Sequence, residues 1–202
     1  EYFKNIQFTV NPYVNFIEDF ILIEPTGIEQ TIRGNFQVWE YRQTQARLMG
    51  VDTDFTAVIT DKLTFNNQFS IVKGQDTKLD QPLINMPAAQ LSNGLQYTLP
   101  ILNEAFVGLE STYVFEQNEF PDNNFEVFLP QTETFEVVDV STPPDAYFLL
   151  NMKAGTTFKW TEHNTMTVNV NVQNLLNTSY RDYLNRLRYY ADDLGRNVVL
   201  QI

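Results

Sequence analysis

The segment MTVNVNVQ, residues 166–173, alternates strictly between apolar and polar side chains. On an extended chain the pattern sorts them onto two faces, with Met166, Val168, Val170 and Val172 on one and Thr167, Asn169, Asn171 and Gln173 on the other. A period of two over this length predicts a β-strand with one apolar and one polar face. The polar face holds amides and hydroxyls but no charge, whereas a strand facing bulk water usually carries lysine or glutamate. The segment therefore predicts a strand whose polar face lines a wet interior.

The same alternation recurs along the chain and predicts an all-β, antiparallel fold of about eight strands. The strands are expected at residues 4–23, 36–60, 63–71, 88–99, 107–116, 146–160, 166–173 and 195–202. Because proline cannot donate to a strand ladder, a bulge or kink is expected at Pro12 in the first of them.

The connections between these strands alternate in length. Short turns at residues 60–62, 100–103 and 161–165 alternate with long loops at residues 24–35, 74–87, 118–145 and 178–194. Bacterial transmembrane barrels have short periplasmic turns and longer outer loops, so this alternation predicts a transmembrane β-barrel segment. Aromatic residues of the apolar faces near the short turns fit an interfacial girdle: Phe65, Tyr97, Phe158 and Trp160.

The composition excludes several other classes. No run of about 18 apolar residues is present, so no transmembrane helix is predicted. The net charge of −12 argues against a nucleic-acid partner. The absence of cysteine excludes a disulfide framework and a thiolate metal site.

Three segments also carry a family resemblance. VQNLLNTSYRDYL (residues 172–184) and RLRYYADDLGRNVVLQI (residues 186–202) resemble the closing two strands and last outer loop of TonB-dependent outer-membrane receptors. The resemblance is densest in residues 174–183 and 195–200, and ARLMGVDTDF (residues 46–55) resembles a mid-barrel strand of the same family. It implies that residues 1–202 are the C-terminal part of a barrel of about 22 strands. The plug domain and the first barrel strands are then expected outside this chain. Outer-membrane barrels usually finish on an aromatic residue, so the final Ile202 indicates truncation at that end as well.

The resemblance further implies a transport function. Members take up a scarce, bulky nutrient such as a ferric siderophore, haem, cobalamin or an oligosaccharide across the outer membrane of a Gram-negative bacterium. The implied partners are the TonB-type energy-coupling complex, reached through the absent N-terminal region, the lipid of the outer membrane, and a small-molecule or metal-chelate ligand. No bond is made or broken, so neither an enzymatic activity nor a cofactor is expected.

Two clusters of arginine and aromatic residues are candidates for ligand binding. The last long loop holds Arg181, Arg186 and Arg188 with Tyr180, Tyr183, Tyr189 and Tyr190, and the second predicted strand holds Trp39, Tyr41 and Arg42. Such side chains bind anionic or planar ligands through bidentate hydrogen bonds and stacking. The alternative interpretation is that Asp182, Asp192 and Asp193 neutralise these arginines and fold the loop.

No catalytic or metal site is predicted. His163 is the sole histidine, and a zinc site needs companion ligands. The pairs Asp52 with Asp54, and Asp192 with Asp193, could be read as paired carboxylates, but a hydrated lumen or contacts to a plug explain the first pair better than hydrolysis does.

Other functions stay open on the sequence alone. A complete eight-stranded outer-membrane barrel would anchor or adhere instead of transporting, and a soluble β-sandwich could bind carbohydrate with its aromatic loops. A hydrolase ranks below both, because no convincing catalytic set is present.

Overall fold

A computed structural model describes residues 5–100, 104–129, 132–159, 161 and 164–202. Within these ranges the chain forms eleven strands and one short 3₁₀ helix. The strands are β1 (Asn5–Thr31), β2 (Gly34–Thr60), β3 (Leu63–Asp76), β4 (Gln81–Pro82), β5 (Gln90–Leu99), β6 (Ala105–Val114), β7 (Phe125–Leu129), β8 (Thr134–Val138), β9 (Tyr147–Lys159), β10 (Thr165–Gln173) and β11 (Asn197–Gln201); the helix is η1 (Arg186–Tyr189). None of the helices in the described part is long and apolar enough to cross a bilayer.

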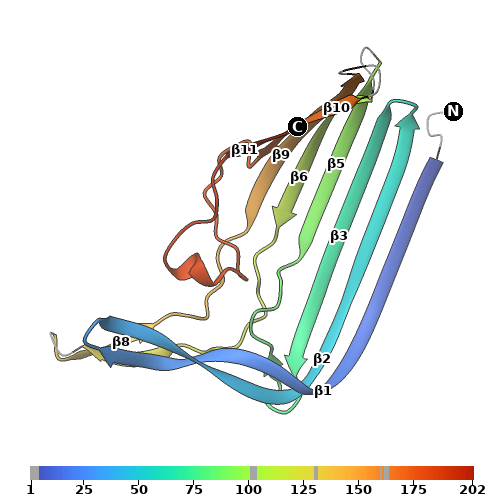
Figure 1. Cartoon of the computed structure of the whole chain (residues 1–202). Coiled ribbons are helices and arrows are strands. Elements are labelled where there is room, and N and C mark those ends of the chain that lie inside the picture. Colours follow the sequence, from blue (N-terminus) through green and yellow to red (C-terminus); the bar gives the residue numbers. More distant parts are fainter. Residues whose placement is uncertain (1–4, 101–103, 130–131, 160, 162–163) are drawn as a thin grey trace.

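Eight strands form one continuous antiparallel sheet in the order β1-β2-β3-β5-β6-β9-β10-β11 (Figure 1). The two-residue strand β4 pairs with β3, and β7 and β8 form a separate hairpin. β1 and β11 are not paired with each other among the described residues, so the sheet is an open wall and not a closed barrel. The predicted all-β, antiparallel barrel segment is thereby confirmed, and the eight expected strands correspond to the eight of the wall.

Of the three expected short turns, only the one at residues 60–62 lies wholly within the described residues; those at residues 100–103 and 161–165 include residues outside them. The β2–β3 turn lies at one end of the wall, at the top of Figure 1, and the long connections and η1 lie toward the other end. Trp160 and His163 fall outside the described residues.

Three local predictions are wrong. No bulge or kink occurs at Pro12, which pairs in register with Val51. β1 pairs only with β2 among the described strands, and a strand with a free edge tolerates a proline without losing a ladder hydrogen bond. Residues 24–35 are not a loop, because β1 and β2 stay paired as far as Thr31 and Gly34. The predicted loop at residues 118–145 contains the β7–β8 hairpin, whose short alternating segments are paired only with each other.

The two faces of the wall differ as the sequence predicts, and the apolar one is uncovered. Phe8, Val14 and Phe16 on β1 keep 65%, 57% and 77% of their surface exposed. The buried core cluster is instead Leu22, Ala46 and Leu83, next to the long connections. A sheet whose apolar face no other layer covers is unlike a β-sandwich, whose inner faces bury each other, and fits a wall that faces lipid.

We call the apolar band of the wall the apolar belt and define it on β3 by the positions from Leu63 to Ile71, with their register partners on neighbouring strands.

On the polar face, two glycines lie beneath aromatic rings of the adjacent strand. Tyr13 pairs with Gly50, and Phe106 pairs with Gly155. An aromatic side chain over a cross-strand glycine pins strand register, so these pairs fix β1 against β2 and β6 against β9.

Candidate functional site in the outer loops

Arg42 of the first predicted cluster is held by two carboxylates. Its Nε and Nη2 donate to the two carboxylate oxygens of Glu24 at 2.8 and 3.2 Å, and its Nη1 donates to Asp76 Oδ2 at 2.8 Å. Asp76 is fully buried and also accepts from the hydroxyl of Thr44 at 2.8 Å. Because β1, β2 and β3 each supply one group, this network ties the three strands together beyond the apolar belt. Arg42 therefore serves the fold here.

The network predicts an acid-sensitive loop. Burial raises the pKa of Asp76, but hydrogen bonds from Arg42, Thr44 and the amides of Leu79 and Lys78 outweigh burial and leave the pKa below its ordinary value of 3.8. Since the pKa is lower in the folded state, the ionised carboxylate stabilises the fold above the unfolded pKa, and this contribution disappears as the pH falls through the folded value. Amide-exchange protection factors at Lys78 and Leu79 should therefore drop below about pH 3.8.

The control for this pH effect is Asp76→Asn, whose side-chain oxygen can still accept from Lys78 and Leu79 but does not titrate, so protection at these amides should not change with pH. The amide of Leu63, which donates to the hydroxyl of Thr60 at 3.1 Å, has no titrating acceptor and should stay constant. A wild-type protection factor at Lys78 that is flat from pH 7 to pH 2 would contradict the assignment.

The last long loop is folded by its own charges. Arg181 Nε donates to Asp192 Oδ1 at 2.7 Å, and its Nη1 donates to the carbonyl of Arg188 at 2.8 Å. The hydroxyl of Ser179 donates to the same Asp192, and these hydrogen bonds, that from Ser179 foremost, hold the pKa of Asp192 below its ordinary value. Asp193 accepts from the amide of Asp182 at 2.8 Å. Asp192 thus neutralises Arg181, and Asp193 helps to fold the loop, as in the alternative interpretation of the sequence.

Arg188 is enclosed, although it belongs to the predicted ligand-binding set. Only 5% of its surface is exposed, and its guanidinium carbon lies 4.2 Å from the ring centre of Tyr183 and 4.8 Å from that of Tyr189. Its Nη2 donates to the carbonyl of Val140 at 3.3 Å, and the Tyr189 hydroxyl donates to the same carbonyl at 3.0 Å. The stacked guanidinium thus joins η1 to the end of the loop that carries β7 and β8.

Tyr41, Arg186 and Tyr190 are exposed, Trp39 is half-buried, and the two clusters meet at these residues. The guanidinium carbon of Arg186 lies 5.8 Å from the ring centre of Trp39, although the two residues are far apart in sequence. Tyr41 and Tyr190 keep 79% and 75% of their surface exposed. We call Trp39, Tyr41, Arg186 and Tyr190 the exposed aromatic–arginine group. It offers a cation and π-faces on the side of the wall with the long connections.

Asn174 positions the loop that carries Arg186 and was not predicted as a site residue. Its backbone has φ 49°, and only 3% of the residue is exposed. The side-chain oxygen accepts from the amide of Thr178 at 2.8 Å, and the nitrogen donates to the carbonyls of Thr178 and Leu194 at 2.8 and 3.3 Å. The only sequence signal is an asparagine directly after a strand, since asparagine tolerates the left-handed region better than most residues do.

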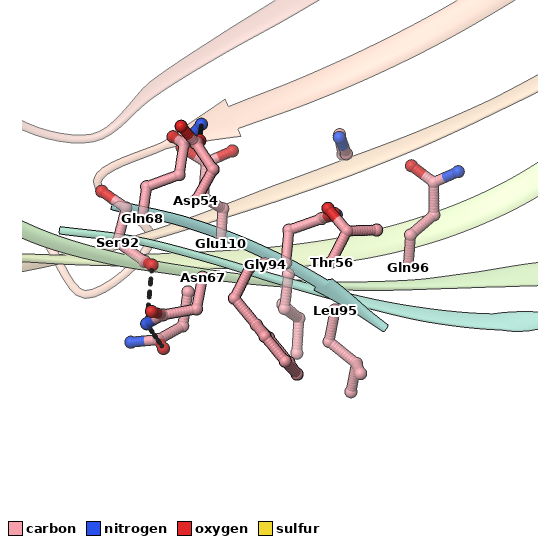
Figure 2. A pocket seen from close by; sticks show the side chains of 14 residues that line it. Asp54, Thr56, Asn67, Gln68, Ser92, Gly94, Leu95, Gln96 and Glu110 are labelled. Atoms are coloured by element: carbon pink, nitrogen blue, oxygen red, sulfur yellow. Dashed lines mark hydrogen bonds between the residues drawn. The ribbon is translucent and has the colours of Figure 1, made fainter. Parts of the chain in front are cut away.

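The polar face of the wall carries a shallow hollow of about 250 Å³ (Figure 2). Asp54, Gln68 and Glu110 line it, and Gln68 Nε2 donates to Asp54 Oδ1 at 2.8 Å. Asp52 accepts from the hydroxyl of Ser70 at 2.7 Å. The volume is below that of ordinary small-molecule pockets, and each aspartate is bonded to a neutral neighbour on the next strand. This surface can contact whatever occupies the lumen, but it does not bring two carboxylates together for acid–base chemistry.

Among the described residues, no group of three or more histidine, cysteine, aspartate or glutamate side chains is placed to hold a metal ion.

The fold and the sequence identify the family. The chain belongs to the TonB-dependent receptors, because the family model described as "TonB dependent receptor-like, beta-barrel" matches residues 1–175. The match ends before the last long loop and β11, which carry much of the resemblance seen in the sequence. No curated protein matches the chain.

Solved structures show the same wall. The chain matches a copper transporter, OprC, with a TM-score of 0.68 at 16% identity, covering 95% of this chain and 27% of that one. It matches the siderophore receptor PirA from Acinetobacter baumannii with a TM-score of 0.61 at 15% identity, covering 96% and 28%. The ferripyoverdine receptor of the outer membrane of Pseudomonas aeruginosa gives a TM-score of 0.53 at 15% identity, covering 95% and 24%. The chain thus spans about a quarter of the length of these proteins, and at this identity the likeness concerns the fold.

Proposed function

We propose that this chain forms the C-terminal barrel wall and outer loops of a receptor for energy-coupled uptake of a scarce nutrient across the outer membrane. Family membership supports the receptor class. The observation that carries the transport proposal is the pairing of an uncovered apolar face with a polar face of amides and hydroxyls on the same strands. That pairing suits a wall with lipid on one side and a hydrated lumen on the other.

The ligand we propose is a metal chelate of the siderophore type, with haem, cobalamin and oligosaccharides as the other members of the same bulky class. The exposed aromatic–arginine group supports this choice, since an arginine and aromatic faces suit anionic and planar ligands. The solved relatives named for copper, a siderophore and ferripyoverdine point to metal cargo in proteins of this fold. Energy would come from a TonB-type complex contacting a plug that precedes this part of the barrel.

Cysteine labelling in the full-length receptor tests the placement in the membrane. Val168 and Val170 should react with a lipid-phase probe, and Asn169 and Asn171 with an aqueous probe, because successive strand residues face opposite sides. This chain contains no cysteine, so its own background is zero. If the valine sites do not react with lipid-phase probes and the receptor dissolves without detergent, the proposed membrane placement is wrong.

Uptake of ferric siderophores tests the ligand. Arg186→Ala should lower the affinity for a cognate chelate by about tenfold or more, since a hydrogen bond to a charged group contributes about 1.5–3 kcal/mol. Arg196→Ala is the matched control, because Arg196 is exposed in the same region and, among the described residues, the cation–π contact with Trp39 comes from Arg186. Uptake of ⁵⁵Fe-labelled catecholate and hydroxamate chelates provides the readout. Equal uptake by both variants with every chelate would remove Arg186 from the binding group.

A further inference from the structure

Three polar side chains interrupt the apolar face of the wall in a single row. Asn67 on β3 pairs in register with Asn93 on β5, which pairs with Ser111 on β6. We call these three residues the amide row. Each is flanked along its strand by two large apolar side chains on the same face: Phe65 and Phe69, Leu95 and Leu91, Leu109 and Tyr113. The row is therefore a polar patch enclosed by apolar residues.

The amide row lies near the middle of the apolar belt. From Leu63 to Asn67 a strand rises about 13 Å, and a tilt of about 40° reduces this to about 10 Å of depth. The apolar band of an outer-membrane barrel is about 25 Å tall. The row is thus too deep for the headgroups of either leaflet to reach it.

Figure 2 shows that Asn67 points away from the lumen face. Asn67 and Leu95 lie on one side of the sheet, and Asp54, Gln68, Thr56 and Gln96 lie on the other. Asn67 Nδ2 donates to Asn93 Oδ1 at 2.8 Å and to the carbonyl of Ser92 at 3.4 Å. Within the described part of the chain, Asn67 Oδ1, Asn93 Nδ2 and the Ser111 hydroxyl have no hydrogen-bond partner. An acceptor and donors thus face the hydrocarbon, where each unsatisfied group costs several kcal/mol.

We propose that the amide row is the centre of a contact between two copies of this receptor within the membrane. The inference rests on the proposed placement of the wall in the outer membrane. The groups left over are self-complementary, because Asn67 offers an acceptor and Asn93 offers a donor. A two-fold axis through the row pairs Asn67 Oδ1 of each copy with Asn93 Nδ2 of the other, as an isologous interface requires. Lipid tails cannot supply these bonds, whereas a second copy supplies both Asn67–Asn93 bonds at once.

The surroundings of the row favour the same partner. The flanking residues are apolar and carry no charge, so two copies of this acidic chain can meet here without repulsion between side chains on this face. Polar side chains that hydrogen-bond between transmembrane segments each contribute about 0.6–2 kcal/mol, and apolar neighbours add packing. The contact is therefore polar at its centre and apolar at its rim.

Cysteine cross-linking in the full-length receptor, in its native membrane and without other cysteines, tests the proposal. Leu95→Cys, next to the row, should form a disulfide-linked dimer of twice the receptor mass under mild oxidation. Val170→Cys, on the same face three strands away, should not. Adding Asn67→Leu and Asn93→Leu to Leu95→Cys should reduce the dimer about tenfold, because the hydrogen bonds at the centre are lost.

The outcomes separate this inference from the proposed function. A monomer at both cysteine sites, with Val168 and Val170 labelled from the lipid phase, would overturn the self-contact and leave the membrane barrel intact. A cross-link from Leu95→Cys to a protein of another mass would also overturn it and identify a different partner. If the valine sites are not labelled from lipid at all, the proposed membrane placement fails instead.

Discussion

Gly50→Ala is expected to destabilise the barrel wall by about 2–4 kcal/mol, near or above the upper end of the usual cost of overpacking. A Cβ at this position would lie 2.5 Å from the carbonyl oxygen of Ile71 and 2.5 Å from the ring of Tyr13. Tyr13 can rotate, but the Ile71 oxygen belongs to the neighbouring strand. Relief therefore requires β2 and β3 to separate in the middle of the sheet.

Gly94→Ala is the matched control for this prediction. Gly94 lies on β5 of the same sheet, and the nearest atom to its added Cβ is 3.8 Å away. That alanine should be neutral or stabilise by about 0.4–1 kcal/mol, because it restricts the unfolded chain. Urea unfolding of the full-length receptor in detergent or liposomes measures both variants. Equal stabilities for the two would show that β2 and β3 accommodate the methyl group, contrary to the geometry.

Asn174→Ala is expected to release the last outer loop, at a cost of about 3 kcal/mol. The change removes three side-chain hydrogen bonds, each contributing about 0.5–1.5 kcal/mol, and places alanine at φ 49°, which costs about 1 kcal/mol more. The amide of Thr178 should lose its exchange protection, and residues 178–194 should become sensitive to protease. Because Arg186 depends on this loop for its place beside Trp39, chelate affinity should fall as well.

Two further variants separate the causes of that effect. Asn174→Gly relieves the backbone strain but still loses the hydrogen bonds, so it should recover only about 1 kcal/mol. Asn177→Ala removes one hydrogen bond from an exposed asparagine that also has positive φ, at 55°, and should cost less than Asn174→Ala. Full recovery by Asn174→Gly would mean that strain, and not the hydrogen bonds, holds the loop.

The strands of the wall could be predicted because the alternation of apolar and polar side chains is visible within each strand segment by itself. A stretch such as residues 166–173 shows its two faces within eight residues, and the register then follows from keeping the apolar side chains of neighbouring strands on one face. Pro12 and residues 24–35 were mispredicted because their structure depends on a partner strand. Whether a proline costs a hydrogen bond, or a polar stretch stays paired, is decided by the neighbour and not by the segment itself.

For the candidate site, the sequence indicates residue types but not their arrangement. Arginine and tyrosine in outer loops indicated a binding surface, yet the sequence does not show that Arg42 is held by Glu24 and Asp76. The contact of Arg186 with Trp39 likewise joins distant segments whose loops have no period. Sequence reasoning therefore could not divide the arginines into those that are held in the fold and those that stay exposed.

The length of β1 and β2 gives this wall a mechanical consequence. Each strand has 27 residues, so the paired hairpin extends about 90 Å, roughly three times the thickness of the hydrocarbon layer. Its register shifts between Ile17 and Phe20 and again between Pro25 and Gly27, and beyond the first shift the ribbon turns sideways in Figure 1. The β1–β2 hairpin thus has two irregular points between its tip and the part that belongs to the wall. Because a register shift interrupts the ladder and bends the strand, we expect a load on the tip at Ile32 to bend the hairpin at these shifts, while residues 5–17 of β1 stay in register with β2.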